Sequence, residues 1–80
     1  MHQDRLREIL KKSGKLSVDP AQLGDESNLY EAGLTSLTTV NLMLAIEEAF
    51  DVEFPDNMLS RKTFQSIQSL SDALEDLQKG

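Results

Sequence analysis

The sequence predicts an all-α protein, a small bundle of three main helices plus one short helix, with a long loop between the first two main helices. Three segments carry apolar residues that recur every three or four positions, which is the spacing of one helix face. Glycine and proline are few and lie between these segments, where they favour turns. Because 80 residues can build only one thin core, we expect residues 1–80 to form a single domain.

The first helix is expected over residues 3–13. Leu6, Ile9 and Leu10 fall on one face, and Gly14 follows as a stop signal. Residues 16–35 then form the long loop, and loops of this length in a small domain are often functional. Its apolar residues are expected to anchor it in the core; these are Leu16, Val18, Leu23 and Leu29.

The second helix is expected over residues 36–50 and has two apolar faces. At 100° per residue, one face is a stripe for the core, made of Thr39, Leu42, Met43, Ile46 and Phe50. The other face holds Leu37, Val40 and Leu44, continues into Glu48 and Asp51, and is bordered by Glu47. Because buried stripes do not normally carry several carboxylates, we expect this second face to be exposed.

Proline and serine mark the remaining elements. Pro55 prevents the second helix from continuing, and residues 57–60 are expected to form one short helical turn. The last helix is expected over residues 66–78, with Ser66 as its N-cap. Phe64 should pack into the core, as should the stripe of Ile67, Leu70, Leu74 and Leu77.

Composition excludes several classes of function. The net charge of −6 argues against a nucleic-acid partner, whereas an acidic domain attracts basic protein surfaces or simply stays soluble. No cysteine is present, so disulfides and thiolate metal sites are excluded. No apolar run approaches the ~18 residues that span a membrane, and the N-terminus is too polar for a secretory signal. We therefore expect a cytoplasmic monomer without a metal, since the exposed apolar face is too small for an obligate dimer.

Residues for conventional catalysis are scarce. The single histidine, His2, lies in a terminus that we expect to fray, so neither a Ser-His-Asp nor a Cys-His site can be built. Ser36 lacks the glycine neighbours of a nucleophile elbow. We expect no catalytic residue and no enzymatic activity.

Ser36 has two interpretations at the start of the second helix. Its hydroxyl could be the N-cap that accepts a hydrogen bond from a first-turn N–H group, and position alone favours this role. Alternatively, a phosphodiester on this hydroxyl would benefit from the partial positive charge of the helix N-terminus.

The surrounding sequence favours the second interpretation. Residues 33–50 read Gly-Leu-Thr-Ser-Leu-Thr-Thr-Val-Asn-Leu-Met-Leu-Ala-Ile-Glu-Glu-Ala-Phe, followed by Asp-Val-Glu-Phe-Pro-Asp at 51–56 and Phe-Gln-Ser-Ile at 64–67. This pattern resembles the acyl carrier protein family and covers nearly the whole chain. The resemblance implies an acyl-carrier-protein-like bundle in which the serine after the long loop, here Ser36, carries 4′-phosphopantetheine donated by coenzyme A. The thiol of that arm would hold a thioester and present it to partner enzymes, which perform the chemistry.

The resemblance also implies partners. These are a phosphopantetheinyl transferase, a ligase that loads the thiol, and downstream acyl-transfer enzymes. The positions expected to contact them are Thr35, Leu37, Val40, Leu44, Glu47 and Glu48.

The chain departs from the family at the start of the second helix. Aspartate usually precedes the modified serine, but here the residue is Thr35, and Thr38 and Asn41 are also neutral. The departures favour a specialised carrier similar to stand-alone aminoacyl carrier proteins, which are loaded by ligases resembling class II aminoacyl-tRNA synthetases. Two alternatives remain: an acyl carrier protein of fatty-acid or polyketide synthesis, and an unmodified helical adaptor whose Leu37, Val40 and Leu44 bind a partner groove.

Overall fold

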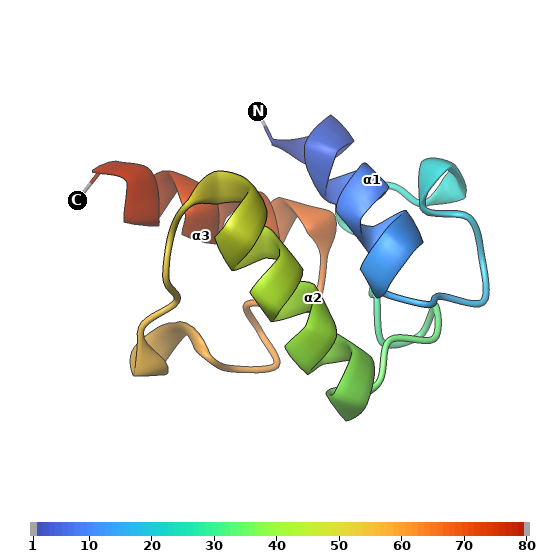
Figure 1. Cartoon of the computed structure of the whole chain (residues 1–80). Coiled ribbons are helices and arrows are strands. Elements are labelled where there is room, and N and C mark those ends of the chain that lie inside the picture. The colour runs from blue at the N-terminus through green and yellow to red at the C-terminus, as the bar shows by residue number, and fades with distance from the viewer. Residues whose placement is uncertain (1, 80) are drawn as a thin grey trace.

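The computed structural model describes residues 2–79 and confirms the all-α fold (Figure 1). Its three α-helices are α1 (Gln3–Ser13), α2 (Ser36–Phe50) and α3 (Ile67–Lys79). Two 3₁₀ turns, Pro20–Gln22 and Asp56–Met58, lie in the connections. Met1 and Gly80, which belong to the expected domain, lie outside the described residues. Between residues 2 and 79 no helix is long and apolar enough to cross a membrane.

Helix α1 has the predicted bounds and lies against both α2 and α3. Leu6 and Leu10 are fully buried, while Ile9 is half-buried against the core. The helix ends at Gly14, whose N–H donates to the Leu10 carbonyl at 2.8 Å. Lys11 and Lys12 lie in the last turn, where positive charge suits the negative end of the helix dipole.

Ser66 caps α3, as predicted, and the helix itself runs from Ile67 to Lys79, one residue later at each end than the expected range 66–78. The Ser66 hydroxyl accepts from the Ser69 N–H at 3.0 Å, and the Ser69 hydroxyl accepts from the Ser66 N–H at 3.0 Å. This reciprocal pair satisfies two N–H groups that the helix itself cannot. As predicted, Ile67, Leu70 and Leu74 are fully buried.

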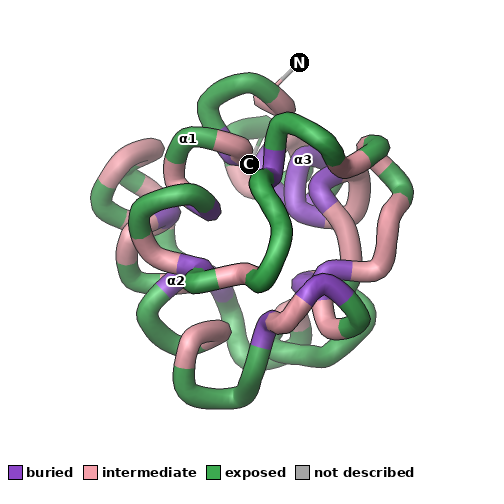
Figure 2. The backbone as a smooth tube through the Cα atoms, turned by 90° about the vertical axis from the view of Figure 1, so that its right-hand side faces the viewer, coloured by how far each residue is buried: buried purple, intermediate pink, exposed green. Residues whose placement is uncertain are grey.

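The core receives residues from the loops as well as from the helices. Figure 2 shows buried residues within the connections and on the inner sides of the helices. Leu29 and Leu34 enter from the first long loop, and Phe54 and Phe64 enter from the connection before α3. The two phenylalanine rings pack at a centroid distance of 5.5 Å. Both connections are therefore fixed by burial.

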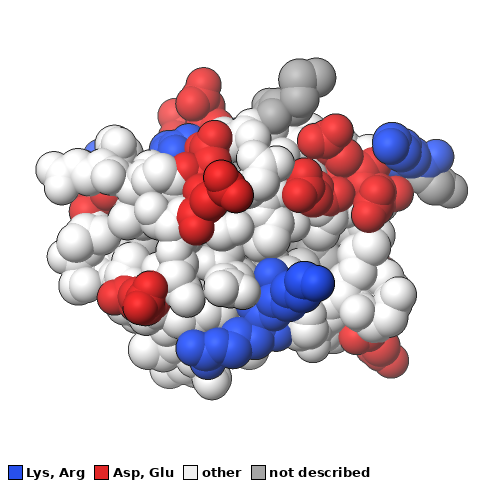
Figure 3. Space-filling view, turned by 180° about the vertical axis from the view of Figure 1, so that it is seen from behind, with Lys and Arg blue, Asp and Glu red and all other residues white. Residues whose placement is uncertain are grey.

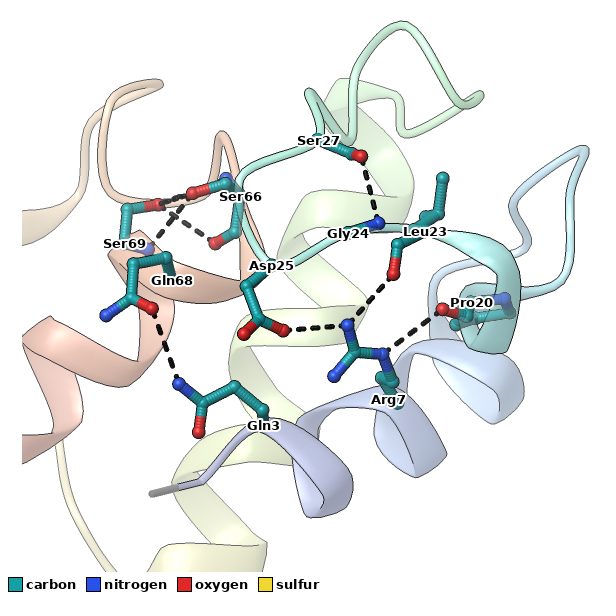
Figure 4. A network of polar contacts seen from close by, with 10 residues as sticks. All are labelled: Gln3, Arg7, Pro20, Leu23, Gly24, Asp25, Ser27, Ser66, Gln68 and Ser69. Carbon is teal, nitrogen blue, oxygen red and sulfur yellow. Dashed lines mark hydrogen bonds and ion pairs between the residues drawn. The ribbon is translucent and has the colours of Figure 1, made fainter.

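Arg7 clamps the first long loop to α1 (Figure 4). Its guanidinium forms an ion pair with Asp25 at 2.7 Å and also donates to the carbonyls of Leu23 at 2.9 Å and Pro20 at 3.3 Å. The same loop is joined to the start of α3, because the N–H of Gln68 donates to the Asp25 carbonyl at 2.8 Å. The loop before α2 is thus held from both sides.

One predicted loop anchor was wrong. Val18 is 41% exposed, whereas Leu29 is fully buried and Leu16 and Leu23 pack against the core from half-buried positions. Pro20 is buried instead of Val18, since the 3₁₀ turn that begins at Pro20 packs against α1. A local apolar pattern in an irregular loop does not specify which of two neighbouring residues faces inward.

The short helix is present in reduced form. It was expected over residues 57–60 and is instead the single 3₁₀ turn Asp56–Met58. Pro55 occupies its N-cap position with φ −72°, close to the value that the proline ring imposes. The turn therefore starts directly after the proline.

The Arg7 clamp makes a stability prediction. We expect Arg7→Met to lower the free energy of unfolding by about 1–3 kcal/mol, because two loop carbonyls and the Asp25 carboxylate lose their donor. Lys11→Met removes the same charge from an exposed site on α1 and should change it by less than about 0.5 kcal/mol. Urea unfolding measures both values. Equal losses in the two variants would contradict the clamp.

Candidate functional site

The backbone path into α2 depends on Gly33. Its φ of 116° is one that L side chains rarely adopt, and a Cβ there would lie 2.9 Å from the Ser17 backbone nitrogen. Ser17 approaches this closely because its N–H and its hydroxyl both donate to the Ala32 carbonyl at 2.8 Å. Glycine is therefore required three residues before Ser36.

Thr35, and not Ser36, is the N-cap of α2. Thr35 has extended backbone angles, φ −117° and ψ 171°, while Ser36 is the first helical residue. The Thr35 hydroxyl accepts from the Thr38 N–H at 3.2 Å, and the Thr38 hydroxyl accepts from the Thr35 N–H at 2.8 Å. The interpretation of Ser36 as the cap was wrong, because the neighbouring threonine performs that role.

The hydroxyl of Ser36 is consequently available. Ser36 is exposed, and its side chain has no hydrogen bond within residues 2–79. The N–H groups of the first helical residues have no intrahelical acceptor, and the first turn of α2 contains no acidic residue. An exposed hydroxyl at the positive end of a helix fits a phosphodiester.

An open groove of about 400 Å³ is lined by Ser36, by other residues of α2 and by residues of the segment 59–64. Its other lining residues are Tyr30, Thr39, Val40, Met43, Leu59, Ser60, Arg61 and Phe64. The guanidinium of Arg61 lies over the ring of Tyr30, 4.1 Å from its centroid. We call this feature the groove.

The second face of α2 is exposed, as its spacing predicted. Leu37, Val40 and Leu44 are 73%, 50% and 54% exposed, and Glu48 is exposed beside them. We call Leu37, Val40 and Leu44 the apolar patch. In the predicted core stripe, Leu42 and Ile46 are fully buried and Met43 and Phe50 pack against the core from half-buried positions. Thr39, the fifth member, instead lines the groove.

Glu47 differs from its neighbour Glu48, because it supports the turn after α2. Its carboxylate accepts from the N–H of Phe54 at 2.8 Å, and it is only half exposed. The turn between them passes through Asp51, which caps the helix in the left-handed conformation with φ 53°. Sequence reasoning placed Glu47 at the edge of the exposed face but could not detect a contact formed across this turn.

Charge is unevenly distributed over the surface and along the sequence. Figure 3 shows the largest group of basic side chains near the lower centre of that face, with acidic groups mostly in its upper half. Between residues 16 and 78 the sequence contains only two basic residues, Arg61 and Lys62. Among residues 2–79, no group of three or more His, Asp or Glu side chains could hold a metal ion.

Sequence reasoning missed Tyr30 and Arg61. They lie in different connections, and neither belongs to a periodic segment. The pair of basic residues at 61 and 62, in an otherwise acidic stretch, was the signal that could have indicated a charged site.

Comparison with known proteins identifies the family. Residues 4–74 match the family model described as the phosphopantetheine attachment site. An aminoacyl carrier protein from Agrobacterium fabrum is 53% identical over 70 residues, which cover 88% of this chain and 84% of that protein. The chain therefore belongs to the phosphopantetheine-attachment family of carrier proteins, whose members bear this arm covalently, and is a homologue of aminoacyl carrier proteins.

Solved structures support the same assignment. One is a complex of an engineered Bradyrhizobium japonicum glycine:carrier protein ligase with carrier protein from Agrobacterium tumefaciens and AMP. The matched chain is 51% identical with a TM-score of 0.88, over 91% of this chain and 97% of that one. A holo acyl carrier protein from Nitrosomonas europaea is 29% identical with a TM-score of 0.88, over 100% of this chain and 99% of that one.

A third structure shows a loaded relative. It is a Bradyrhizobium japonicum glycine:carrier protein ligase with glycylated carrier protein, and the matched chain is 26% identical. The TM-score is 0.78, over 90% of this chain and 96% of that one. These findings confirm the family, the fold class and the phosphopantetheine cofactor expected from the sequence.

The capping geometry predicts that removing the Thr35 hydroxyl lowers stability and that removing the neighbouring Ser36 hydroxyl does not. Thr35→Ala should lower the free energy of unfolding of the apo protein by about 1 kcal/mol, because the N-cap is lost. Ser36→Ala should change it by less than about 0.5 kcal/mol, because its hydroxyl has no partner among the described residues. Thermal or urea unfolding checks both. A larger loss in Ser36→Ala than in Thr35→Ala would show that Ser36 is the cap.

Proposed function

We propose that Ser36 carries 4′-phosphopantetheine and that the chain presents an aminoacyl group, bound to the arm as a thioester, to partner enzymes. The observation that carries this proposal is the exposed Ser36 hydroxyl, which starts α2 without being used as its cap. When bound, the arm supplies a thiol that forms an energy-rich thioester.

Attachment requires only that Ser36 be reachable and correctly oriented. Transfer from coenzyme A bonds the Ser36 Oγ to phosphorus, breaks the pyrophosphate bond, and releases adenosine 3′,5′-bisphosphate and the hydroxyl proton. Thr35 and Thr38 hold the helix start in place during this transfer. The first-turn N–H groups then face the negative charge of the phosphodiester.

An aminoacyl cargo is favoured over a fatty acyl cargo by the relatives. The 53% identical protein is an aminoacyl carrier protein, and structurally similar chains come from complexes with glycine:carrier protein ligase. We propose a loading ligase of that kind, resembling class II aminoacyl-tRNA synthetases, together with a phosphopantetheinyl transferase and downstream acyl-transfer enzymes. A carrier of fatty-acid or polyketide synthesis is the alternative.

Partner docking is assigned to the second face of α2 and its borders. Exposed leucine and valine side chains supply apolar contact area, and acidic residues beside them attract basic partner surfaces. The residues proposed to contact partners are Thr35, Leu37, Val40, Leu44, Glu47 and Glu48.

The proposal extends to the behaviour of the whole chain. Residues 1–80 act as one carrier domain that tethers its substrate and leaves the chemistry to its partners. It works as a monomer in the cytoplasm, where coenzyme A and ATP are available to the enzymes that modify and load it.

Modification of Ser36 is tested directly by mass spectrometry. Apo protein incubated with coenzyme A and a promiscuous phosphopantetheinyl transferase should gain one pantetheinyl mass, and Ser36→Ala should gain none. Thr35→Ser, which retains a capping hydroxyl, is the matched control and should still be modified. A mass gain in Ser36→Ala, or none in the native chain, would refute attachment at Ser36.

Loading tests the cargo and the docking surface together. Holo protein with ATP, glycine and a glycine:carrier protein ligase should form a glycyl thioester. Leu44→Asp should raise the KM for the carrier by roughly tenfold, because a charge replaces an apolar contact, while unfolding stability is nearly unchanged. Val18→Asp, an exposed apolar site on the long loop, should load normally.

Three results would contradict these assignments. Thioester formation only with fatty acyl groups and an acyl ligase would refute the aminoacyl cargo. A large loss of stability in Leu44→Asp would show that the apolar patch is buried, and normal loading of this variant would remove Leu44 from the docking surface.

A further inference from the structure

We propose that the groove holds the pantetheine arm between docking events, and that Arg61 pairs with the phosphodiester of the arm. This inference rests on the proposed attachment at Ser36. It assigns Arg61 as a positioning residue for the prosthetic group.

The guanidinium of Arg61 is placed for this role. It lies 4.1 Å from the centroid of the Tyr30 ring, and both residues line the groove together with Ser36. Stacking on an aromatic face leaves the N–H groups at the edge of the guanidinium free to donate. Those donors match the geometry of phosphate oxygens.

The positive charge of Arg61 has no acidic partner among the described residues. Arg61 forms no ion pair within residues 2–79, and it is exposed. The phosphodiester would bring one negative charge to the end of the groove that Ser36 lines. Because the phosphorus is bonded to Ser36 Oγ in every state of the arm, the attraction to Arg61 acts by turning the phosphodiester, and with it the first bonds of the arm, toward the groove.

Lys62 lies next to Arg61 in the sequence but outside the groove. It lines a separate hollow that also contains Ser69, Asp72 and Asp76. Two acidic residues, Asp72 and Asp76, line the same hollow as Lys62, whereas none of the described acidic residues lines the groove. The chain therefore contains a matched control, since one neighbouring cation faces the groove and the other does not.

The remaining walls suit the rest of the arm. Val40, Met43 and Leu59 offer apolar surface for its methyl groups and methylenes. The Thr39 hydroxyl donates to the Thr35 carbonyl at 2.6 Å, and its oxygen can still accept from an amide N–H of the arm. The groove is open along its length, so the arm can leave it. Val40 belongs both to the groove and to the apolar patch, and a docking partner therefore competes with the seated arm for this side chain.

The test compares ¹⁵N-labelled apo and holo protein by NMR for the native chain, Arg61→Gln and Lys62→Gln. In the native chain, we expect shifts on pantetheinylation at the N–H groups of Tyr30, Val40 and Leu59 and at the Arg61 side chain. Arg61→Gln should lower the ratio of seated to free arm by up to about fivefold, as for loss of an exposed ion pair, and reduce these shifts accordingly. Lys62→Gln should leave them unchanged. Added salt should reduce the shifts in the native chain, because the pair is exposed to screening.

The outcomes separate this inference from the proposed function. Complete pantetheinylation with shifts confined to residues next to Ser36 would overturn the seated arm while leaving attachment intact. Equal effects of Arg61→Gln and Lys62→Gln would overturn the role of Arg61. Absence of a pantetheinyl mass would overturn both the attachment and the inference that rests on it.

Discussion

The reciprocal hydrogen bonds between Thr35 and Thr38 connect the local structure of this chain to its function. They end the long loop at Thr35 and start α2 at Ser36, so that the helix is capped without the Ser36 hydroxyl. An aspartate at position 35 could form a similar cap and would add a negative charge at the helix N-terminus. Threonine therefore keeps the cap while leaving the first turn neutral. The two ends of the long loop meet where Ser17 donates to the Ala32 carbonyl and lies close to Gly33. The cap at Thr35 follows directly after this contact.

The long loop is a scaffold for the site. Arg7 holds it to α1, and the N–H of Leu29 donates to the Gln65 carbonyl at 2.7 Å beside α3. Leu29 and Leu34 also bury their side chains in the core. These attachments fix the position of Ser36 relative to the segment 59–64, which forms the opposite wall of the groove. In this small chain, the long loop between α1 and α2, and not an additional helix, positions Ser36.

Helix α2 has one face buried in the core and another face exposed to solvent. Leu42 and Ile46 face the core, while Leu37 and Leu44 are exposed and belong to the proposed docking surface. Val40 lies at the border of the groove, so the proposed seated and docked states use overlapping surfaces. An exposed ion pair at Arg61 contributes at most about 1 kcal/mol, which allows the arm to be released when a partner binds. A weakly bound arm suits a carrier whose cargo is passed between several enzymes.

Sequence by itself determined the helices and the two faces of α2. Periodicity and caps depend on near neighbours, so α1 and α2 were predicted to the residue and α3 to within one residue at each end. Adjacent Thr35 and Ser36 are both good capping residues, and only the backbone path after Gly33 decided between them. The tertiary structure also decided the exposure of Val18, the bond from Phe54 to Glu47 and the stacking of Arg61 on Tyr30. Each depends on how irregular segments fold back on one another, and no repeating pattern in the sequence specifies that path.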